Sequence, residues 1–180
     1  KDFDGLRKFV GNMIWLGTAI AFVVTLTTTV LCRQILTWMD TPADTFDYAY
    51  NYIWVIFLGI PATMLYNLLS GIIRSLGDSR TPLVFLILSS LLNVVLDIVF
   101  IVTFRMGVAG AGWATLLSQL ISGVLCLAYM VKRFPVLHLN REDLRLRRVY
   151  ARHLLNMGLP MGLQYSITAI GSILLQTAVN

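Results

Sequence analysis

The sequence has few charged residues for its length. Of its 180 residues only 13% are charged, and 57% are hydrophobic, whereas a soluble domain carries about 25% charged residues. The mean hydropathy is +0.76. This shortage of charge excludes an ordinary soluble domain and indicates a membrane protein.

Cysteine and histidine are also scarce. Cys32 and Cys126 lie in separate apolar segments, and His138 and His153 lie in one basic stretch. These spacings match no metal-binding motif, and such cysteines usually act as small hydrophobic side chains. An enzyme would need a nucleophile, a base or a metal that converge on one site, and the sequence offers no such set. We therefore expect no resident metal, no cofactor and no enzymatic activity.

Five apolar stretches are long enough to cross a membrane as helices, which takes about 20 mostly apolar residues each. They cover residues 9–38, 46–76, 81–104, 108–131 and 154–180. Backbone groups in lipid must be satisfied within the segment, so we predict an all-α, polytopic membrane helix bundle. Pro61 and Pro160 should bend or start their helices, because proline removes a backbone donor. The chain starts at Lys1 and stops within an apolar run, so we interpret it as a fragment of a longer protein.

Lysine and arginine are distributed unequally between the two ends of these spans. Twelve lie in the chain start, the turn near residue 77 and the linker 132–153, and two, Arg33 and Arg105, lie on the other side. Because basic residues accumulate on the cytoplasmic side, we predict a cytoplasmic linker and an external loop at 39–45. The basic linker has no nucleic-acid recognition motif. Its residues 141–155 are expected to form an amphipathic helix on the membrane surface.

The third apolar stretch contains an unusual polar stripe. Ser89, Asn93 and Asp97 are spaced at i, i+4 and i+8, which places them on one face of a helix. A charge inside a spanning helix is costly and is a functional candidate by default. Carboxylate and amide oxygens suit hard cations such as sodium, and a buried carboxyl can also exchange a proton. The sequence therefore predicts a cation site that includes Asn93 and Asp97.

Other predicted helices carry polar stripes of the same kind, and polar faces in lipid should turn inward. These stripes are Thr63, Asn67, Ser70 and Arg74; Thr115, Ser118, Gln119 and Ser122; and Gln164, Thr168, Ser172 and Gln176. For each serine, threonine and glutamine, plain hydrogen bonding between helices is an alternative interpretation. The small residues of 107–114 predict close helix packing. The segment SRTP predicts a helix start, with Thr81 as the cap and Pro82 as the first helical residue.

Two long segments together resemble the multidrug and toxic compound extrusion (MATE) family in its bacterial branches. They are LLSGIIRSLGDSRTPLVFLILSSLLNVVLDIVFI and MGVAGAGWATLLSQ, and MGLPMGLQYS resembles the start of the family's second half. The family's cytoplasmic turn motif matches Arg74, Gly77, Asp78 and Pro82. The resemblance implies a transporter of twelve helices in two lobes. Residues 1–131 would then be helices three to six of the N-terminal lobe, 132–153 the cytoplasmic linker between lobes, and 154–180 the truncated first helix of the C-terminal lobe.

The resemblance also implies a function and a site. Family members are antiporters that export drugs or organic cations across the cytoplasmic membrane, driven by entry of Na⁺ or H⁺. The positions that match the cation site are Asn93, Asp97 and Thr115, with Asn67 a weaker match. The implied partners are a drug-like substrate and the lipid bilayer, and we expect a monomer in the inner membrane with no nucleic-acid partner.

One alternative function stays open within the same superfamily, namely a flippase of lipid-linked oligosaccharides. Its anionic pyrophosphate cargo would favour a basic central cavity. The predicted membrane interior instead holds an aspartate and amides, and the arginines lie near the helix ends.

Overall fold

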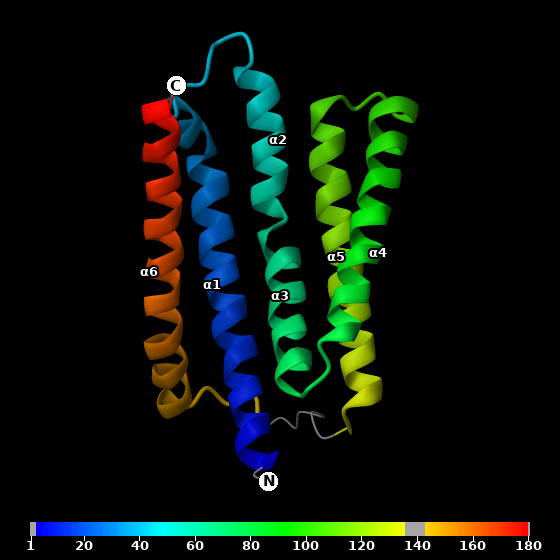
Figure 1. The fold of residues 1–180 in the computed structure, drawn as a ribbon, viewed down its shortest axis with the longest axis vertical. Helices are drawn as coiled ribbons and strands as arrows, with labels where there is room; N and C mark the ends of the chain where they lie inside the picture. Colours follow the sequence, from blue (N-terminus) through cyan, green and yellow to red (C-terminus); the bar gives the residue numbers. More distant parts are fainter. Residues whose placement is uncertain (1–2, 136–142, 180) are drawn as a thin grey trace. The chain divides into compact units, whose positions relative to one another are not determined.

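The computed structural model describes residues 3–135 and 143–179, with side chains described for 4–135, 143–168 and 171. The elements in order are α1 (Phe3–Trp38), α2 (Phe46–Leu58), α3 (Ile60–Ser75), α4 (Arg80–Ile98), the π-helical segment η1 (Val99–Thr103), α5 (Val108–Arg133) and α6 (Arg148–Val179) (Figure 1). The predicted all-α membrane bundle is confirmed. The chain divides into two compact units, residues 17–138 and residues 1–16 with 139–180, and each is described by itself.

Helix α5 is the centre of the unit 17–138. It packs against α2, α3 and α4, and Figure 1 shows it alongside α4. Small residues permit this packing, because a Cβ at Gly112 would lie 3.1 Å from Val55 Cβ and a Cβ at Gly123 would lie 3.1 Å from Leu65 Cδ2. Gly110, Gly112 and Ala114 are all buried, so the predicted close approach at the start of this helix is confirmed.

The second apolar stretch folds as two helices rather than one. Helices α2 and α3 meet at Gly59 with a bend of 41°, and Pro61 is the second residue of α3. Proline fits the first turn of a helix, where its missing N–H would have no partner. The expectation that Pro61 bends or starts a helix is confirmed.

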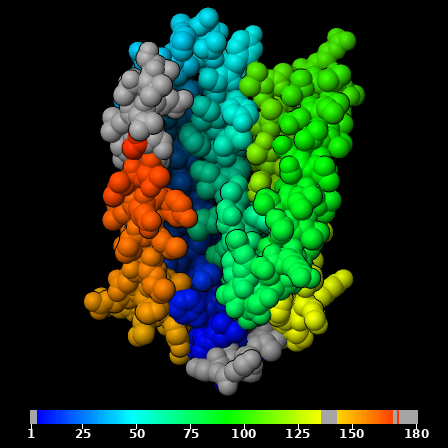
Figure 2. All heavy atoms as spheres, viewed as in Figure 1, coloured from blue at the N-terminus to red at the C-terminus, as the bar shows by residue number. Residues whose placement is uncertain are grey.

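Several helices are long and apolar enough to cross a membrane. Among the described residues they are Asp4–Trp38, Arg80–Thr103 and Val108–Arg133, with the bent pair α2–α3 as a fourth if it counts as one span. Helix α6 does not meet this criterion, so its role as a fifth span stays a prediction. Large apolar side chains of α4, such as Leu83, Val84 and Leu91, are exposed, and Figure 2 shows α4 (green) open on one face of its unit. Such a surface suits contact with lipid.

The start of α4 differs from the prediction. The helix begins at Arg80 with Ser79 as its N-cap, so Thr81 is not the cap and Pro82 is the third helical residue. The reason is that the Asp78 carboxylate does the capping. It accepts the Thr81 backbone N–H at 3.1 Å and the Thr81 hydroxyl at 2.7 Å.

The predicted surface helix at 141–155 is also corrected. Residues 143–147 are not helical, and α6 begins at Arg148 and runs on past this segment. Residues 141 and 142 lie outside the described part of the chain. Pro160 lies inside α6 and does not start a helix, which a spanning helix can tolerate when other groups satisfy the freed carbonyl.

Residues 143–147 dock on the first turns of α1. The side chain of Asn12 is fully buried. Its Oδ1 accepts the Arg147 backbone N–H at 2.7 Å, and its Nδ2 donates to the Lys8 carbonyl at 2.8 Å. Arg7 pairs with Asp143 at 3.9 Å, and Gly11 leaves room for the Asp143 backbone, which any Cβ there would strike. The end of the basic linker is therefore fixed to α1 by hydrogen bonds that its basic composition does not indicate.

Candidate functional site

The polar stripes of α4 and α5 face each other. The Ser89 hydroxyl donates to the Ser118 carbonyl at 3.1 Å, and the Ser122 hydroxyl donates to the Phe85 carbonyl at 3.2 Å. Ser89, Ser118 and Ser122 are buried. The prediction that polar faces turn inward is confirmed for these two helices. The three serines match the simpler interpretation, in which they hold helices together.

Asn93 of α4 and Thr115 of α5 are hydrogen-bonded one helical turn further along the same interface. Asn93 Nδ2 donates to Thr115 Oγ1 at 3.4 Å, and Thr115 Oγ1 donates to the Ala111 carbonyl at 3.0 Å. Both residues are half-buried. This bond uses the amide nitrogen of Asn93 and leaves its carbonyl oxygen available as a ligand.

Asp97 lies one helical turn beyond Asn93 on the same face of α4. Its Oδ1 is buried and has no hydrogen-bond partner among the described residues. Burying a carboxylate oxygen without a partner is costly, so this oxygen is a candidate ligand for a cation or a proton. Asn93, Asp97 and Thr115 therefore form one oxygen-rich cluster, which we call the α4–α5 polar cluster.

A π-helical turn begins two residues after Asp97. Helix α4 passes into η1 at Val99, and the Phe104 N–H donates to the Val99 carbonyl at 3.0 Å. Gly110 of α5 lies against this turn, because a Cβ there would be 3.1 Å from Phe100 Cβ. Single π-helical turns often mark functional sites in helices. The feature has no recognisable signal in the sequence.

Asn67 is not part of the α4–α5 polar cluster. Its side chain is exposed on α3, and its neighbour Tyr66 donates to the Pro82 carbonyl at 2.9 Å. Asn93 lies 11 residues beyond Pro82 in α4, about 16 Å at 1.5 Å per residue. In the other predicted stripe Gln164 and Thr168 are exposed on α6, and the side chains of Ser172 and Gln176 lie outside the described part.

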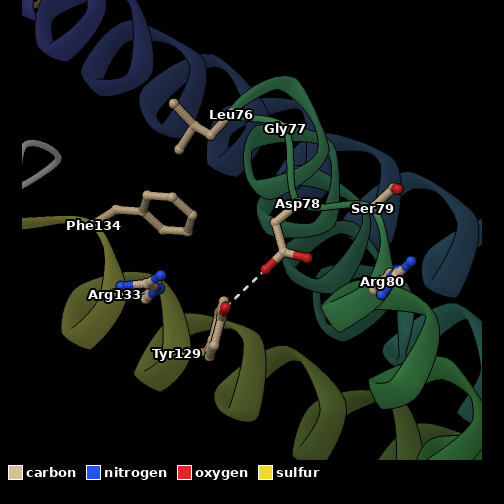
Figure 3. Close-up of a pocket in the computed structure, with 8 residues that line it drawn as sticks. All are labelled: Leu76, Gly77, Asp78, Ser79, Arg80, Tyr129, Arg133 and Phe134. Carbon is tan, nitrogen blue, oxygen red and sulfur yellow. Dashed lines mark hydrogen bonds between the residues drawn. The ribbon is translucent and has the colours of Figure 1, made fainter.

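The predicted turn motif connects α3 to α4 and reaches α5. Gly77 has φ +96°, a conformation that favours glycine, and Pro82 is buried. Arg74 Nε donates to the Ser70 carbonyl at 3.2 Å. The Tyr129 hydroxyl donates to Asp78 Oδ2 at 2.7 Å (Figure 3).

Hydrogen bonds keep the Asp78 carboxylate charged. Donation by the Thr81 hydroxyl and N–H, and then by Tyr129, lowers the pKa of Asp78 to about 2. Sequence reasoning did not identify Tyr129, which lies 51 positions from Asp78, because no local pattern links the two. Asp78 is thus a structural cap that also links the α3–α4 turn to α5. Both of its oxygens already accept hydrogen bonds.

No metal-binding cluster accompanies these groups. The described residues contain no group of three or more histidine, cysteine, aspartate or glutamate side chains able to hold a metal. The α4–α5 polar cluster offers one carboxylate and neutral oxygens, a donor set suited to Na⁺ or to a proton rather than to a transition metal.

The apolar helices define a polytopic membrane protein. The family model described as MatE matches residues 1–99. The chain therefore belongs to the MatE family, whose members are transporters and not enzymes.

Named relatives agree with this assignment. The chain is 32% identical to "Probable multidrug resistance protein YpnP" of Bacillus subtilis over 99% of its own length and 40% of that protein. It is 26% identical to "Multidrug export protein MepA" of Staphylococcus aureus over 89% of its length and 36% of that protein. The chain thus spans about two fifths of the length of the curated relatives it matches.

Solved structures show the same fold. A MATE transporter crystallised in the bent conformation matches with a TM-score of 0.86 and 29% identity over 94% of this chain and 38% of the other. A MOP superfamily transporter from Pyrococcus furiosus matches with a TM-score of 0.81 and 28% identity, over 90% of this chain and 36% of the other. The binding pocket of the Pyrococcus protein has a reverse polarity that suggests a different function. The fold is therefore shared by proteins for which different functions are suggested, and the function of this chain must be argued from its own residues.

Proposed function

We propose that the full-length protein exports drug-like compounds or organic cations in exchange for entering Na⁺ or H⁺. The names of the relatives, a multidrug resistance protein and a multidrug export protein, support the substrate class. The observation that carries the coupling is the buried Asp97 Oδ1, which has no hydrogen-bond partner in the described part of the chain.

The α4–α5 polar cluster suggests how coupling works. Asp97 supplies the counter-charge, and Asn93 and Thr115 supply neutral oxygens that replace water around a cation. A proton would neutralise the same carboxylate. Binding can drive a conformational change only if the two states bind the cation differently. The cluster joins two helices, so any shift between α4 and α5 changes its affinity. Asn67 is left out of this site because it lies at a different level of the bundle.

The proposed orientation follows from charge. Within residues 17–138, the Asp78–Tyr129 hydrogen bond joins the start of α4 to the end of α5. Arg74, Arg80, Lys132 and Arg133 therefore lie at one end of this unit. We assign this end and the linker 132–153 to the cytoplasm. The protein would then cross the inner membrane several times, and we expect it to act as a monomer.

The flippase alternative receives no support from a particular observation. Helix α4 has no lysine or arginine after Arg80, and α5 has none before Lys132. An anionic pyrophosphate cargo would meet the Asp97 carboxylate rather than a basic group in this part of the interior.

The test is ethidium efflux from vesicles that hold the full-length protein under an imposed Na⁺ or H⁺ gradient. Asp97→Asn removes the charge while keeping the shape, so efflux should fall on the order of 100-fold, the upper range of coupling free energies. Asn93→Ala and Thr115→Ala each remove one neutral oxygen and should lower efflux about fivefold. Asp44→Asn, an exposed loop carboxylate, is the matched control. Normal efflux by Asp97→Asn at equal protein level would show that the carboxylate is structural.

A further inference from the structure

A separate cavity lies at the charged end of the unit 17–138. It has a volume of about 530 Å³ and lies where the α3–α4 turn meets the C-terminal end of α5. Gly77, Asp78 and Arg80 line it from the turn, and Tyr129, Arg133 and Phe134 line it from α5 and the residue that follows (Figure 3). Its volume is that of a site for a small molecule or a headgroup.

The cavity contains two guanidinium groups without a carboxylate partner. Within the described part of the chain, the ion pairs join Arg7 to Asp4 and Asp143, and none involves Arg80 or Arg133. The acid in the cavity, Asp78, already accepts bonds from Thr81 and Tyr129 on its two oxygens. Asp78 keeps its negative charge, so two guanidinium groups against one carboxylate leave a net positive charge among the lining residues. Guanidinium groups match the geometry of phosphate oxygens.

The place of the cavity indicates where its ligand comes from. Arg80 is the first residue of α4 and Arg133 the last of α5, and both helices are candidate membrane spans. Span ends lie at the depth of lipid headgroups. Tyr129 and Phe134 pack edge to face with ring centroids 6.2 Å apart, so the cavity combines an apolar aromatic wall with basic groups. Basic pockets between spanning helices on the cytoplasmic side suit anionic headgroups.

We propose that this cavity binds the phosphate group of an anionic phospholipid between Arg80 and Arg133, with the glycerol portion against Phe134. This site is distinct from the α4–α5 polar cluster. The inference uses the cytoplasmic assignment made under the proposed function, but it does not depend on the proposed transport activity. A free phosphate from the cytoplasm shares the same chemistry, so the experiment must separate the two sources.

The test measures phosphatidylglycerol bound to the full-length protein in phosphatidylcholine nanodiscs, at fixed ionic strength, by native mass spectrometry. The double variant Arg80→Gln/Arg133→Gln should lower phosphatidylglycerol affinity on the order of 100-fold, because each charge-assisted hydrogen bond to the phosphate contributes about tenfold. The matched control is Arg74→Gln/Lys132→Gln. It removes the same charge from the same end at exposed residues that do not line the cavity. All four side chains are exposed, so both proteins should fold, and equal thermal midpoints would verify this.

The outcomes separate clearly. A loss in the cavity variant at least threefold greater than the loss in the control supports the site, because general attraction to an anionic surface lowers both equally. Equal losses in both variants would show general attraction to an anionic surface and overturn it, as would absence of phosphatidylglycerol binding by the unmodified protein. Inorganic phosphate is the second probe. If millimolar phosphate displaces the lipid from the unmodified protein, the ligand is a free phosphate and the lipid assignment is wrong.

Discussion

Two aspartates of this chain have opposite environments, although both have polar residues near them in the sequence. Asp78 has hydrogen-bond donors on both oxygens, whereas Asp97 has a buried oxygen with none in the described part of the chain. A carboxylate that is satisfied by the protein has no reason to bind a cation, and one that is unsatisfied does. Local hydrogen bonding therefore assigns a structural role to Asp78 and favours a coupling role for Asp97.

A first prediction concerns the pH dependence of Asp78. Hydrogen bonds from Thr81 and Tyr129 lower its pKa from 3.8 to about 2. The stabilisation is therefore complete above pH 3.8 and is lost as the pH falls through about 2. Asp78→Asn should lower the thermal midpoint by an amount that is constant from about pH 5 to 9. Tyr129→Phe should lower it less, because it removes only one donor.

The measurement for Asp78 is thermal unfolding of the full-length protein in detergent across that pH range. Tyr48→Phe is the control for the tyrosine, because Tyr48 is exposed. A destabilisation by Asp78→Asn that changes between about pH 5 and 8 would show that the carboxyl titrates there, contrary to its hydrogen bonding.

At the scale of the elements, most of the fold could be predicted from the sequence. Long apolar runs can only be helices in lipid, so the helices were predictable in place. The second run is broken at Gly59, and the span formed by α6 stays a prediction. The inward turn of the α4 and α5 stripes was also predictable, because an i, i+4 spacing fixes one face. The contacts that could not be predicted are hydrogen bonds between residues far apart in the sequence. The Asp78–Tyr129 bond and the docking of residues 143–147 on Asn12 join residues far apart in sequence.

Local backbone geometry also determined features that the sequence pattern does not reveal. The sequence pattern placed the α4 start at Pro82, but a capping carboxylate upstream moved it to Arg80. The π-helical turn at Val99 comes from a shift in backbone hydrogen bonds, which leaves no pattern in side-chain polarity. The level of Asn67 relative to Asn93 was not predictable, because the offset between neighbouring helices is set by their packing.

A second prediction compares two glycines in helices. A Cβ at Gly110 would lie 3.1 Å from Phe100 Cβ, whereas nothing lies within 4 Å of a Cβ at Gly71. Gly110→Ala should cost about 1–3 kcal/mol through overpacking against η1. Gly71→Ala should be neutral or stabilise α3 by up to about 1 kcal/mol through helix propensity.

Thermal midpoints of the two glycine variants, measured on the full-length protein, check this. Gly110→Ala should also reduce ion-driven efflux, since η1 closely follows Asp97. Equal midpoints for the two variants would mean that α5 does not pack tightly on the π-helical turn.

At the scale of the whole molecule, the twelve-to-two charge bias predicts the orientation in the membrane. Cysteine probes at Thr41 to Asp44 should react from outside the cell, and probes from Asn140 to Arg148 should react only after permeabilisation. Ala43 and Leu146 are suitable positions because both are exposed. Cys32 and Cys126 are fully buried and should be replaced by alanine to give a clean background. Labelling with the opposite sidedness would reverse the proposed orientation.

The central claim is that the α4–α5 polar cluster couples cation entry to export, and coupling between two ligands must act in both directions. The most direct measurement therefore imposes an ethidium gradient, with no ion gradient, on vesicles that hold the full-length protein, and follows Na⁺ and H⁺ with dyes. The account predicts that ethidium flux drives one of these cations the opposite way in the unmodified protein and in Asp44→Asn. In Asp97→Asn no cation should move. Cation movement by Asp97→Asn equal to that of the unmodified protein would contradict the account.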